Sequence, residues 1–96
     1  MTDKRFIDGL LRHDSKIIEE IYKNFAHRIQ IHIQKNGGTS EDAKDVFHNA
    51  LMVIFQKAKT GKFELTSRFY TYLFSVCHFI WDREKKKKSN NTVTID

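Results

Sequence analysis

The sequence has 96 residues, of which 40% are hydrophobic and 30% are charged, and its formal net charge is +5. A chain of this length can bury one core, so we expect a single domain. It contains no run near the roughly 18 to 20 apolar residues that a membrane-spanning helix needs, and residues 1–9 lack the apolar centre of a signal peptide. These features predict a soluble, cytoplasmic protein. The single cysteine, Cys77, cannot form an internal disulfide, which agrees with a reducing compartment.

The positive charge lies almost wholly in the second half of the chain. Residues 1–56 contain 8 Lys or Arg and 8 Asp or Glu, whereas residues 57–88 contain 9 basic and 3 acidic residues. Because aromatic residues are interleaved with the basic ones, this distribution favours a nucleic-acid partner over a membrane surface. A basic helix end is also favourable for the helix dipole, which accounts for one or two lysines of residues 85–88 and leaves the rest of the bias unexplained.

The scarcity of helix-breaking residues predicts an all-α bundle of four helices. There is no proline, and glycine occurs at only 4 positions, which is typical of a few long helices. Thr2 or Asp3 is expected to cap a short first helix that ends near His13. The apolar residues of this helix are Phe6, Ile7, Leu10 and Leu11.

The second predicted helix begins at Asp14 or Ser15 and continues to about Lys35, where the Asn-Gly-Gly sequence of residues 36–38 ends it. Its apolar residues recur at helical spacing, at Ile17, Ile18, Ile21, Tyr22, Phe25, Ile29 and Ile33. Residues 28–34 also alternate between apolar and polar, so a strand is the alternative there. Continuity with the preceding periodicity favours a helix.

The third predicted helix, residues 39–59, has the clearest amphipathic pattern. Thr39 and Asp42 have the spacing of a capping box, and Thr60 with Gly61 ends the helix. One face is apolar, at Ala43, Val46, Phe47, Ala50, Leu51, Ile54, Phe55 and Ala58. The other face carries a stripe that is polar except for one methionine, at Asp45, His48, Asn49, Met52 and Gln56. This stripe is either a solvated surface or a surface built for a protein partner.

A loop from Thr60 to about Thr66 precedes the last predicted helix, which Thr66 or Ser67 caps and which ends near Lys88. Residues 89–96 have no periodicity and are expected to form a flexible tail or the start of an interdomain linker. The predicted core face of the helix is Phe69, Tyr72, Leu73, Val76 and Ile80. A second, aromatic face at Tyr70, Phe74, His78 and Trp81 either closes the core or stacks on unpaired bases.

The sequence shows no catalytic or metal-binding constellation. The histidines lack metal-ligand spacing with a carboxylate or a cysteine, at His13, His27, His32, His48 and His78. Cys77 and His78 are adjacent, so their side chains point about 100° apart on a helix. There is no glycine-rich phosphate loop and no nucleophile elbow. We therefore expect no enzyme activity, no cofactor and no metal.

Two stretches carry a recognisable pattern. Residues 40–49 read Ser-Glu-Asp-Ala-Lys-Asp-Val-Phe-His-Asn, and residues 69–77 read Phe-Tyr-Thr-Tyr-Leu-Phe-Ser-Val-Cys, followed by the lysine run. Together they resemble region 2 of bacterial sigma factors of the extracytoplasmic-function type, and the resemblance covers nearly the whole chain from Phe6. It implies a role in DNA-templated transcription initiation. In that family, region 2 docks on the clamp helices of the largest subunit of RNA polymerase, and recognises and melts the promoter -10 element.

The resemblance assigns residues to two surfaces. The implied polymerase-binding residues are Asp42, Asp45, His48, Asn49, Met52 and Gln56. The implied DNA-binding residues are Lys62, Arg68, Tyr72, Ser75, His78, Asp82 and Lys86. The implied partners are core RNA polymerase, the -10 region as melted single-stranded DNA, and an anti-sigma factor as a further candidate.

The sequence departs from the family pattern at two places. His48 and Asn49 stand where the family usually has Gln-Glu, which removes one carboxylate, and Phe79 stands where it usually has Asn. The domain that reads the -35 element is not within the 96 residues, so we expect either a fragment of a longer protein or a stand-alone region 2. Two other functions stay open. These are a non-specific nucleic-acid-binding helical module and a protein-interaction helical bundle.

Overall fold

The chain folds into four helices, as predicted. The computed structural model describes the backbone of residues 3–94 and the side chains of residues 3–87. The helices are α1 (Lys4–Leu11), α2 (Ser15–Lys35), α3 (Ser40–Lys59) and α4 (Phe69–Thr94). Residues 3–94 contain no strand, so the strand alternative for residues 28–34 is wrong. Over the same residues, no helix combines the length and the apolar character needed to cross a membrane.

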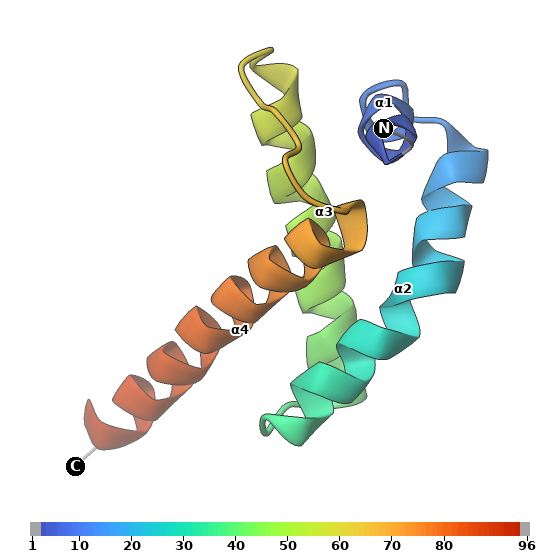
Figure 1. Cartoon of the computed structure of the whole chain (residues 1–96). Helices are drawn as coiled ribbons and strands as arrows, with labels where there is room; N and C mark the ends of the chain where they lie inside the picture. Colours follow the sequence, from blue (N-terminus) through green and yellow to red (C-terminus); the bar gives the residue numbers. More distant parts are fainter. Residues whose placement is uncertain (1–2, 95–96) are drawn as a thin grey trace.

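Helix α3 is the centre of the bundle (Figure 1). It packs against α1, α2 and α4, and α2 also contacts α1 and α4. Helix α4 crosses α3, and its C-terminal part extends away from the other helices toward the lower left of Figure 1. The N-terminal half of the chain therefore forms a scaffold around α3, and α4 adds a second long helix beside it.

The predicted local signals at the start of α2 and at both ends of α3 are confirmed. The Oγ1 atom of Thr39 accepts a hydrogen bond from the Asp42 backbone N–H at 3.0 Å, and Oδ2 of Asp42 accepts one from the Thr39 N–H at 2.9 Å. This is the complete capping box. Asp14 caps α2, since its side chain accepts hydrogen bonds from two backbone N–H groups of the first turn. After α3, Gly61 has a φ of 79°, a conformation in which a residue without Cβ meets no clash.

The start of α4 differs from the prediction. The helix begins at Phe69, and neither Thr66 nor Ser67 caps it. Its first turn is capped instead by Asp3, whose Oδ2 accepts a hydrogen bond from the Phe69 backbone N–H at 2.6 Å. Asp3 stands before α1, but its side chain makes no capping bond to that helix. A residue at one end of the chain therefore fixes the start of the last helix.

Replacing Asp3 by alanine is expected to lower the free energy of unfolding by about 0.5–2 kcal/mol, because an N–H group at the start of α4 loses its acceptor. Asparagine caps helices about as well as aspartate, so Asp3→Asn should lose much less. Chemical denaturation of the two variants and the wild type measures the difference. Equal losses in both variants would contradict the capping role and indicate that only the charge of Asp3 matters.

The predicted end of the last helix near Lys88 is wrong, because α4 continues to Thr94. No proline or glycine follows Lys88 to stop it, and backbone hydrogen bonds propagate a helix without an apolar face. That residues 89–96 lead into a linker stays a prediction.

The core gathers apolar side chains from all four helices. Its buried residues are Phe6, Ile7, Leu10, Ile21, Ile29, Ile33, Ala43, Val46, Phe47, Ala50, Leu51, Ile54, Ala58, Phe69, Leu73, Cys77 and Trp81. On α4, the buried seam repeats every four residues, at Phe69, Leu73, Cys77 and Trp81. The predicted core face was therefore right for Phe69 and Leu73. Tyr72, Val76 and Ile80 lie at the edge of the seam and are only half-buried.

The second aromatic face predicted on α4 is not an open surface. Trp81 is buried, and its Nε1–H donates to the backbone carbonyl of Asn36 at 3.0 Å. Tyr70 lies against Phe25 of α2, with ring centroids 5.4 Å apart. Phe74 lies against His32 of the same helix at 4.5 Å. Packing against α2 thus partly covers Tyr70 and Phe74, whereas His78 stays exposed.

Candidate nucleic-acid and partner interface

The predicted polymerase-binding residues share one face of α3. Their spacing over residues 42–56 places all six side chains within about a third of the helix circumference. Five are exposed, namely Asp45, His48, Asn49, Met52 and Gln56. Met52 is 47% exposed, which is high for a methionine and is typical of an adaptable contact surface. Asp42 is half-buried, and its carboxylate serves the capping box.

One end of this stripe opens into a hollow of about 300 Å³ between α3 and α4. The hollow is lined by Asp42, Asp45, Val46, His48, Asn49, Trp81 and Glu84. Three of these side chains are carboxylates and none is Lys or Arg, so the local potential is negative. A positively charged side chain of a partner is the group that this hollow accommodates best.

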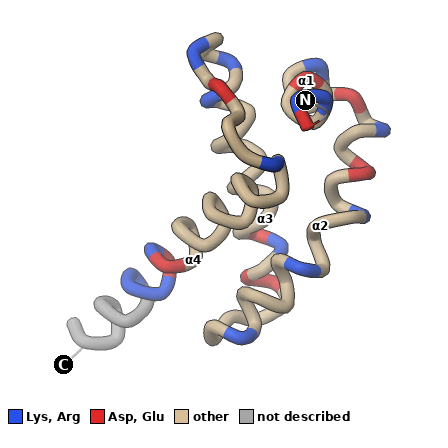
Figure 2. The backbone as a smooth tube through the Cα atoms, in the orientation of Figure 1, with Lys and Arg blue, Asp and Glu red and all other residues tan. Residues whose placement is uncertain are grey.

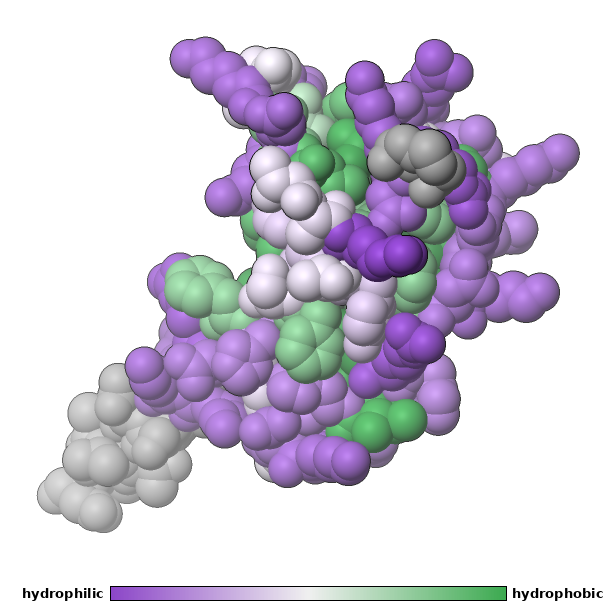
Figure 3. Space-filling view, viewed as in Figure 1, coloured by the Kyte–Doolittle hydropathy of each residue, from purple (hydrophilic) through white to green (hydrophobic). Residues whose placement is uncertain are grey.

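Basic residues lie in two places, one before the start of α4 and one toward its C-terminal end. Figure 2 shows Lys and Arg at the α3–α4 connection and again toward the C-terminal end of α4. Between these places, residues 69–81 contain no Lys, Arg, Asp or Glu. On the face of the molecule seen in Figure 3, hydrophobic side chains are interspersed with hydrophilic ones over this part of α4. The helix thus presents a neutral, aromatic middle flanked by positive charge.

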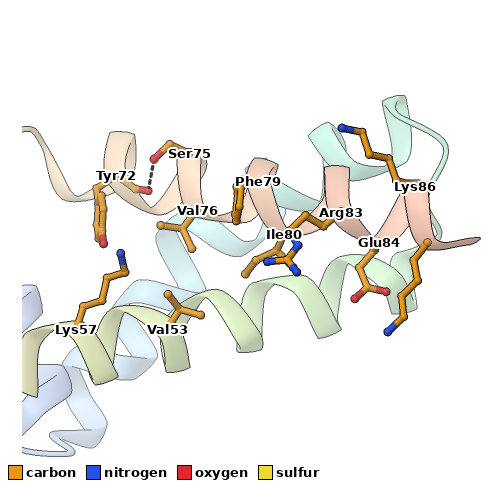
Figure 4. Close-up of a pocket in the computed structure, with 11 residues that line it drawn as sticks. Val53, Lys57, Tyr72, Ser75, Val76, Phe79, Ile80, Arg83, Glu84 and Lys86 are labelled. Atoms are coloured by element: carbon orange, nitrogen blue, oxygen red, sulfur yellow. Dashed lines mark hydrogen bonds between the residues drawn. The ribbon is translucent and has the colours of Figure 1, made fainter.

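A groove of about 860 Å³ runs between α3 and α4 on the side of the basic residues. Figure 4 shows Val76 and Ile80 of α4 pointing toward α3, where Val53 faces Val76 and Lys57 faces Tyr72. The full lining is Val53, Lys57, Tyr72, Ser75, Val76, Phe79, Ile80, Arg83, Glu84, Lys86 and Lys87. An apolar floor is therefore bordered by four cationic side chains and one carboxylate.

The structure brings only some of the predicted DNA-binding residues together. Tyr72, Ser75 and Lys86 line the groove, and Asp82 pairs with Lys86 at 3.5 Å. Lys62 and Arg68 are exposed in the connection before α4. His78 does not line the groove, and its exposed ring contacts His32 of α2. Helical spacing places residue 78 next to residues 75 and 82, at the border of the face that carries the groove, so its grouping with the DNA-binding residues stays a prediction.

Tyr72 and Ser75 are held in place at one end of the groove. The Tyr72 ring lies 5.2 Å from the Phe63 ring of the connection, and burial raises the pKa of its hydroxyl. The Ser75 hydroxyl donates to the Tyr72 backbone carbonyl at 2.8 Å (dashed in Figure 4). Tyr72 therefore stays neutral and its hydroxyl can donate a hydrogen bond to an anion.

His32 and His78 form a pair that the sequence did not predict. His32 Nε2 and His78 Nδ1 are 3.1 Å apart, which is a hydrogen bond between α2 and α4. One ring must donate and the other accept, so the bond is lost if both rings carry two protons. Burial lowers the pKa of His32, and the positive charges of His78 and Lys85 lower it further.

This lowered pKa predicts a pH-dependent stability. The unfolded chain takes up a proton at His32 near pH 6.5, before the folded chain does. The contribution of His32 to the free energy of unfolding is therefore complete above about pH 6.5 and is lost as the pH falls through the lowered pKa. Denaturation curves between pH 7.5 and about 5 should show a smaller slope for His32→Gln than for the wild type. His27→Gln, at an exposed position on the same helix, is the control. A slope in His32→Gln equal to that of the wild type would contradict the lowered pKa of His32.

Cys77 is a buried, unreactive thiol, and the described residues form no metal-binding group. Burial raises the pKa of the Cys77 thiol to about 12, so the thiol stays protonated at neutral pH. Over the part of the chain that the structure describes, no three His, Cys, Asp or Glu side chains are grouped closely enough to hold a metal ion. The groove and the α3 stripe are therefore considered as binding surfaces.

Comparisons with protein-family models, curated proteins and solved structures returned no match.

Three residues of the groove are not among the implied DNA-binding residues, namely Lys57, Phe79 and Arg83. Lys57 and Arg83 belong to the basic part of the sequence that predicts an anionic partner, whereas Phe79 was not expected to line a binding surface. Phe79 is 60% exposed, and the Arg83 guanidinium lies 5.6 Å from its ring centroid. Ser75, Phe79 and Arg83 are spaced by four residues, which puts them on one helix face. This spacing is visible in the sequence, but the aromatic pattern at residues 70, 74, 78 and 81 indicates a different face of the helix as the candidate for stacking.

Proposed function

We propose that the chain is a sigma factor region 2 domain, which docks on core RNA polymerase and recognises and melts the promoter -10 element. The observation that carries the proposal is the presence of two unlike surfaces on the adjoining helices α3 and α4. One is the exposed polar and methionine stripe of α3. The other is the basic, apolar-floored groove with the connection before α4. Catalysis is left to the polymerase.

The α3 surface supports docking on a protein. Asp45, Asn49 and Met52 are exposed side by side on a helix whose opposite face is anchored in the core. A rigid helix face costs little conformational entropy when it binds, so it suits helical partners such as the clamp helices of the polymerase. The acidic hollow beside Asp45 fits a basic side chain of that partner.

The groove and the connection support binding of promoter DNA. Lys57, Arg83 and Lys86 border the groove, and Lys62 and Arg68 lie exposed at the α3–α4 connection. Neutralising five phosphates of a single strand would give a slope of about -3.5 in a plot of log affinity against log salt concentration. Tyr72 supplies a neutral hydroxyl and an aromatic edge at one end of the groove.

Asp45→Ala is expected to weaken capture of core RNA polymerase by about 5- to 100-fold, because a charge at the centre of the docking surface is lost. A pull-down with immobilised chain and purified core polymerase measures the loss. Glu19→Ala is the matched control, since it removes the same charge from an exposed position on α2. Both variants should bind single-stranded DNA as the wild type does.

The outcomes separate this function from the two alternatives. Equal capture by Asp45→Ala and the wild type would contradict docking through α3. If DNA binding persisted without polymerase capture, the result would favour a non-specific nucleic-acid-binding module. Absent or salt-insensitive DNA binding in the presence of polymerase would favour a protein-interaction bundle.

A further inference from the structure

Phe79 is the least covered large hydrophobic side chain among the described residues. It is 60% exposed, against 47% for Met52 and 41% for Ile31. Its ring lies in the lining of the α3–α4 groove, where Val76 and Ile80 form the floor (Figure 4). An exposed aromatic ring beside cationic side chains offers a stacking surface to a flat, negatively charged ligand, so this position points to a binding function.

The charge around Phe79 identifies the kind of ligand. Arg83 lies 5.6 Å from the ring centroid, and Lys57, Lys86 and Lys87 border the same groove. The groove's single carboxylate is that of Glu84, so its lining carries a net charge of +3, from four cations and one anion. The ligand must therefore combine an apolar, flat group with negative charge.

We infer that the groove holds an unpaired nucleobase stacked on Phe79, with the flanking phosphates bound by Arg83 and the neighbouring lysines. Any base can stack in this way because every base has a flat π-surface. A duplex does not fit, because its bases are stacked on each other and its outside is phosphate and sugar. The inference rests on the proposed function, since it assigns a subsite for the strand that the domain would hold after melting.

An acidic amphipathic peptide is a poorer fit to this groove. A helical peptide would need several exposed apolar anchors arranged along the groove. The apolar side chains of the floor, Val53, Val76 and Ile80, are half-buried. Among the apolar residues that line the groove, only Phe79 is largely exposed. One protruding ring beside cations matches one base beside its phosphates.

The test uses the full chain and a fluorescently labelled single-stranded oligonucleotide at low salt. Phe79→Leu keeps an apolar side chain but removes the ring, and it should bind the strand about 5- to 100-fold more weakly than the wild type. An abasic strand of the same length has the same phosphates and no bases. The wild type and Phe79→Leu should bind that strand equally.

Two further variants separate stacking from charge. Arg83→Ala should weaken binding to the normal and the abasic strand alike and should reduce the salt slope by about 0.7. Phe79→Trp should bind at least as well as the wild type, and its fluorescence should be quenched by the normal strand only. Trp81 is buried and supplies a constant background in this measurement. Ile31→Ala, at an exposed position on α2, is the control for loss of an apolar side chain.

The inference is overturned if Phe79→Leu binds the normal strand as the wild type does, or if the Phe79→Trp signal is unchanged by saturating oligonucleotide. The inference would also be overturned if Phe79→Leu bound an acidic peptide more weakly than the wild type does but bound the strand equally well. That result would favour a peptide site. These outcomes do not depend on polymerase capture. Asp45→Ala tests that separately, so the subsite and the proposed function can fail independently.

Discussion

Replacing Phe69 by alanine is expected to lower the free energy of unfolding by about 3–5 kcal/mol. Phe69 has no exposed surface, and its ring stacks on Phe6 of α1 with centroids 5.0 Å apart. The Phe25 ring of α2 lies 6.0 Å from Phe69 and 5.7 Å from Phe6, so the three rings form one cluster. The substitution would open a cavity where three helices meet, at the residue whose backbone N–H is capped by Asp3.

This loss is a large part of the roughly 5–15 kcal/mol that stabilises a domain of this kind. Thermal or chemical unfolding followed by circular dichroism measures it, and Phe69→Leu should lose less because it leaves a smaller cavity. Leu11→Ala, at a position that is 37% exposed, is the control. A loss in Phe69→Ala no greater than in Leu11→Ala would contradict the central place of Phe69.

Trp81→Ala is expected to have an effect of similar size, about 3–5 kcal/mol. Trp81 is 3% exposed, its Nε1–H donates to the Asn36 carbonyl, and its ring contacts the position of Gly38 so closely that an added Cβ would lie 2.9 Å from it. The tryptophan therefore joins α4 to the turn between α2 and α3. Its removal leaves both a cavity and a partly buried carbonyl without its donor.

A second aromatic residue of α4 gives the matched comparison. Phe79→Ala removes a ring that is 60% exposed, so its effect on stability should be within about 0.5 kcal/mol. The pair thus predicts opposite phenotypes, in which Trp81→Ala unfolds easily and Phe79→Ala folds normally but binds single strands poorly. Equal stability of the two variants, measured by denaturation, would contradict the assignment of Trp81 to the core.

Local signals predicted the helices well. The capping box of Thr39 and Asp42 and the terminating Gly61 involve residues within one helical turn, so their spacing in the sequence is sufficient to identify them. The cap that Asp3 provides for Phe69 joins residues 66 positions apart, and no sequence spacing encodes such a contact. The start of α3 could therefore be predicted from sequence spacing, whereas the start of α4 could not, because its cap comes from a distant part of the chain.

The candidate site shows the same division. The α3 stripe follows from helical periodicity, and all five of its residues are exposed as an outer face requires. On α4, both candidate faces were aromatic, and the packing partner decided which of them is covered. The second face is partly covered, because Phe74 contacts His32, Tyr70 contacts Phe25 and Trp81 is buried. Phe79, which belongs to neither candidate face, is the aromatic ring of α4 that stays most exposed. The sequence alone could not supply that choice, because it depends on where α2 lies.

The departures from the sigma pattern also gain a physical meaning. His48 and Asn49 are exposed beside the acidic hollow, to which Glu84 of α4 contributes a carboxylate. Phe79 replaces a hydrogen-bonding amide by a ring, and stacking in place of base-edge recognition reduces sequence preference. We therefore expect weaker promoter discrimination than the family pattern implies.

The most direct test of the central claim is co-elution of the chain with bacterial core RNA polymerase and a labelled single strand of -10 sequence in size-exclusion chromatography. The proposal predicts that the chain elutes with the polymerase, that Asp45→Ala does so less, and that the strand is retained more strongly by the complex than by either protein alone. Elution of the wild-type chain apart from the polymerase at micromolar concentrations would contradict the proposed function.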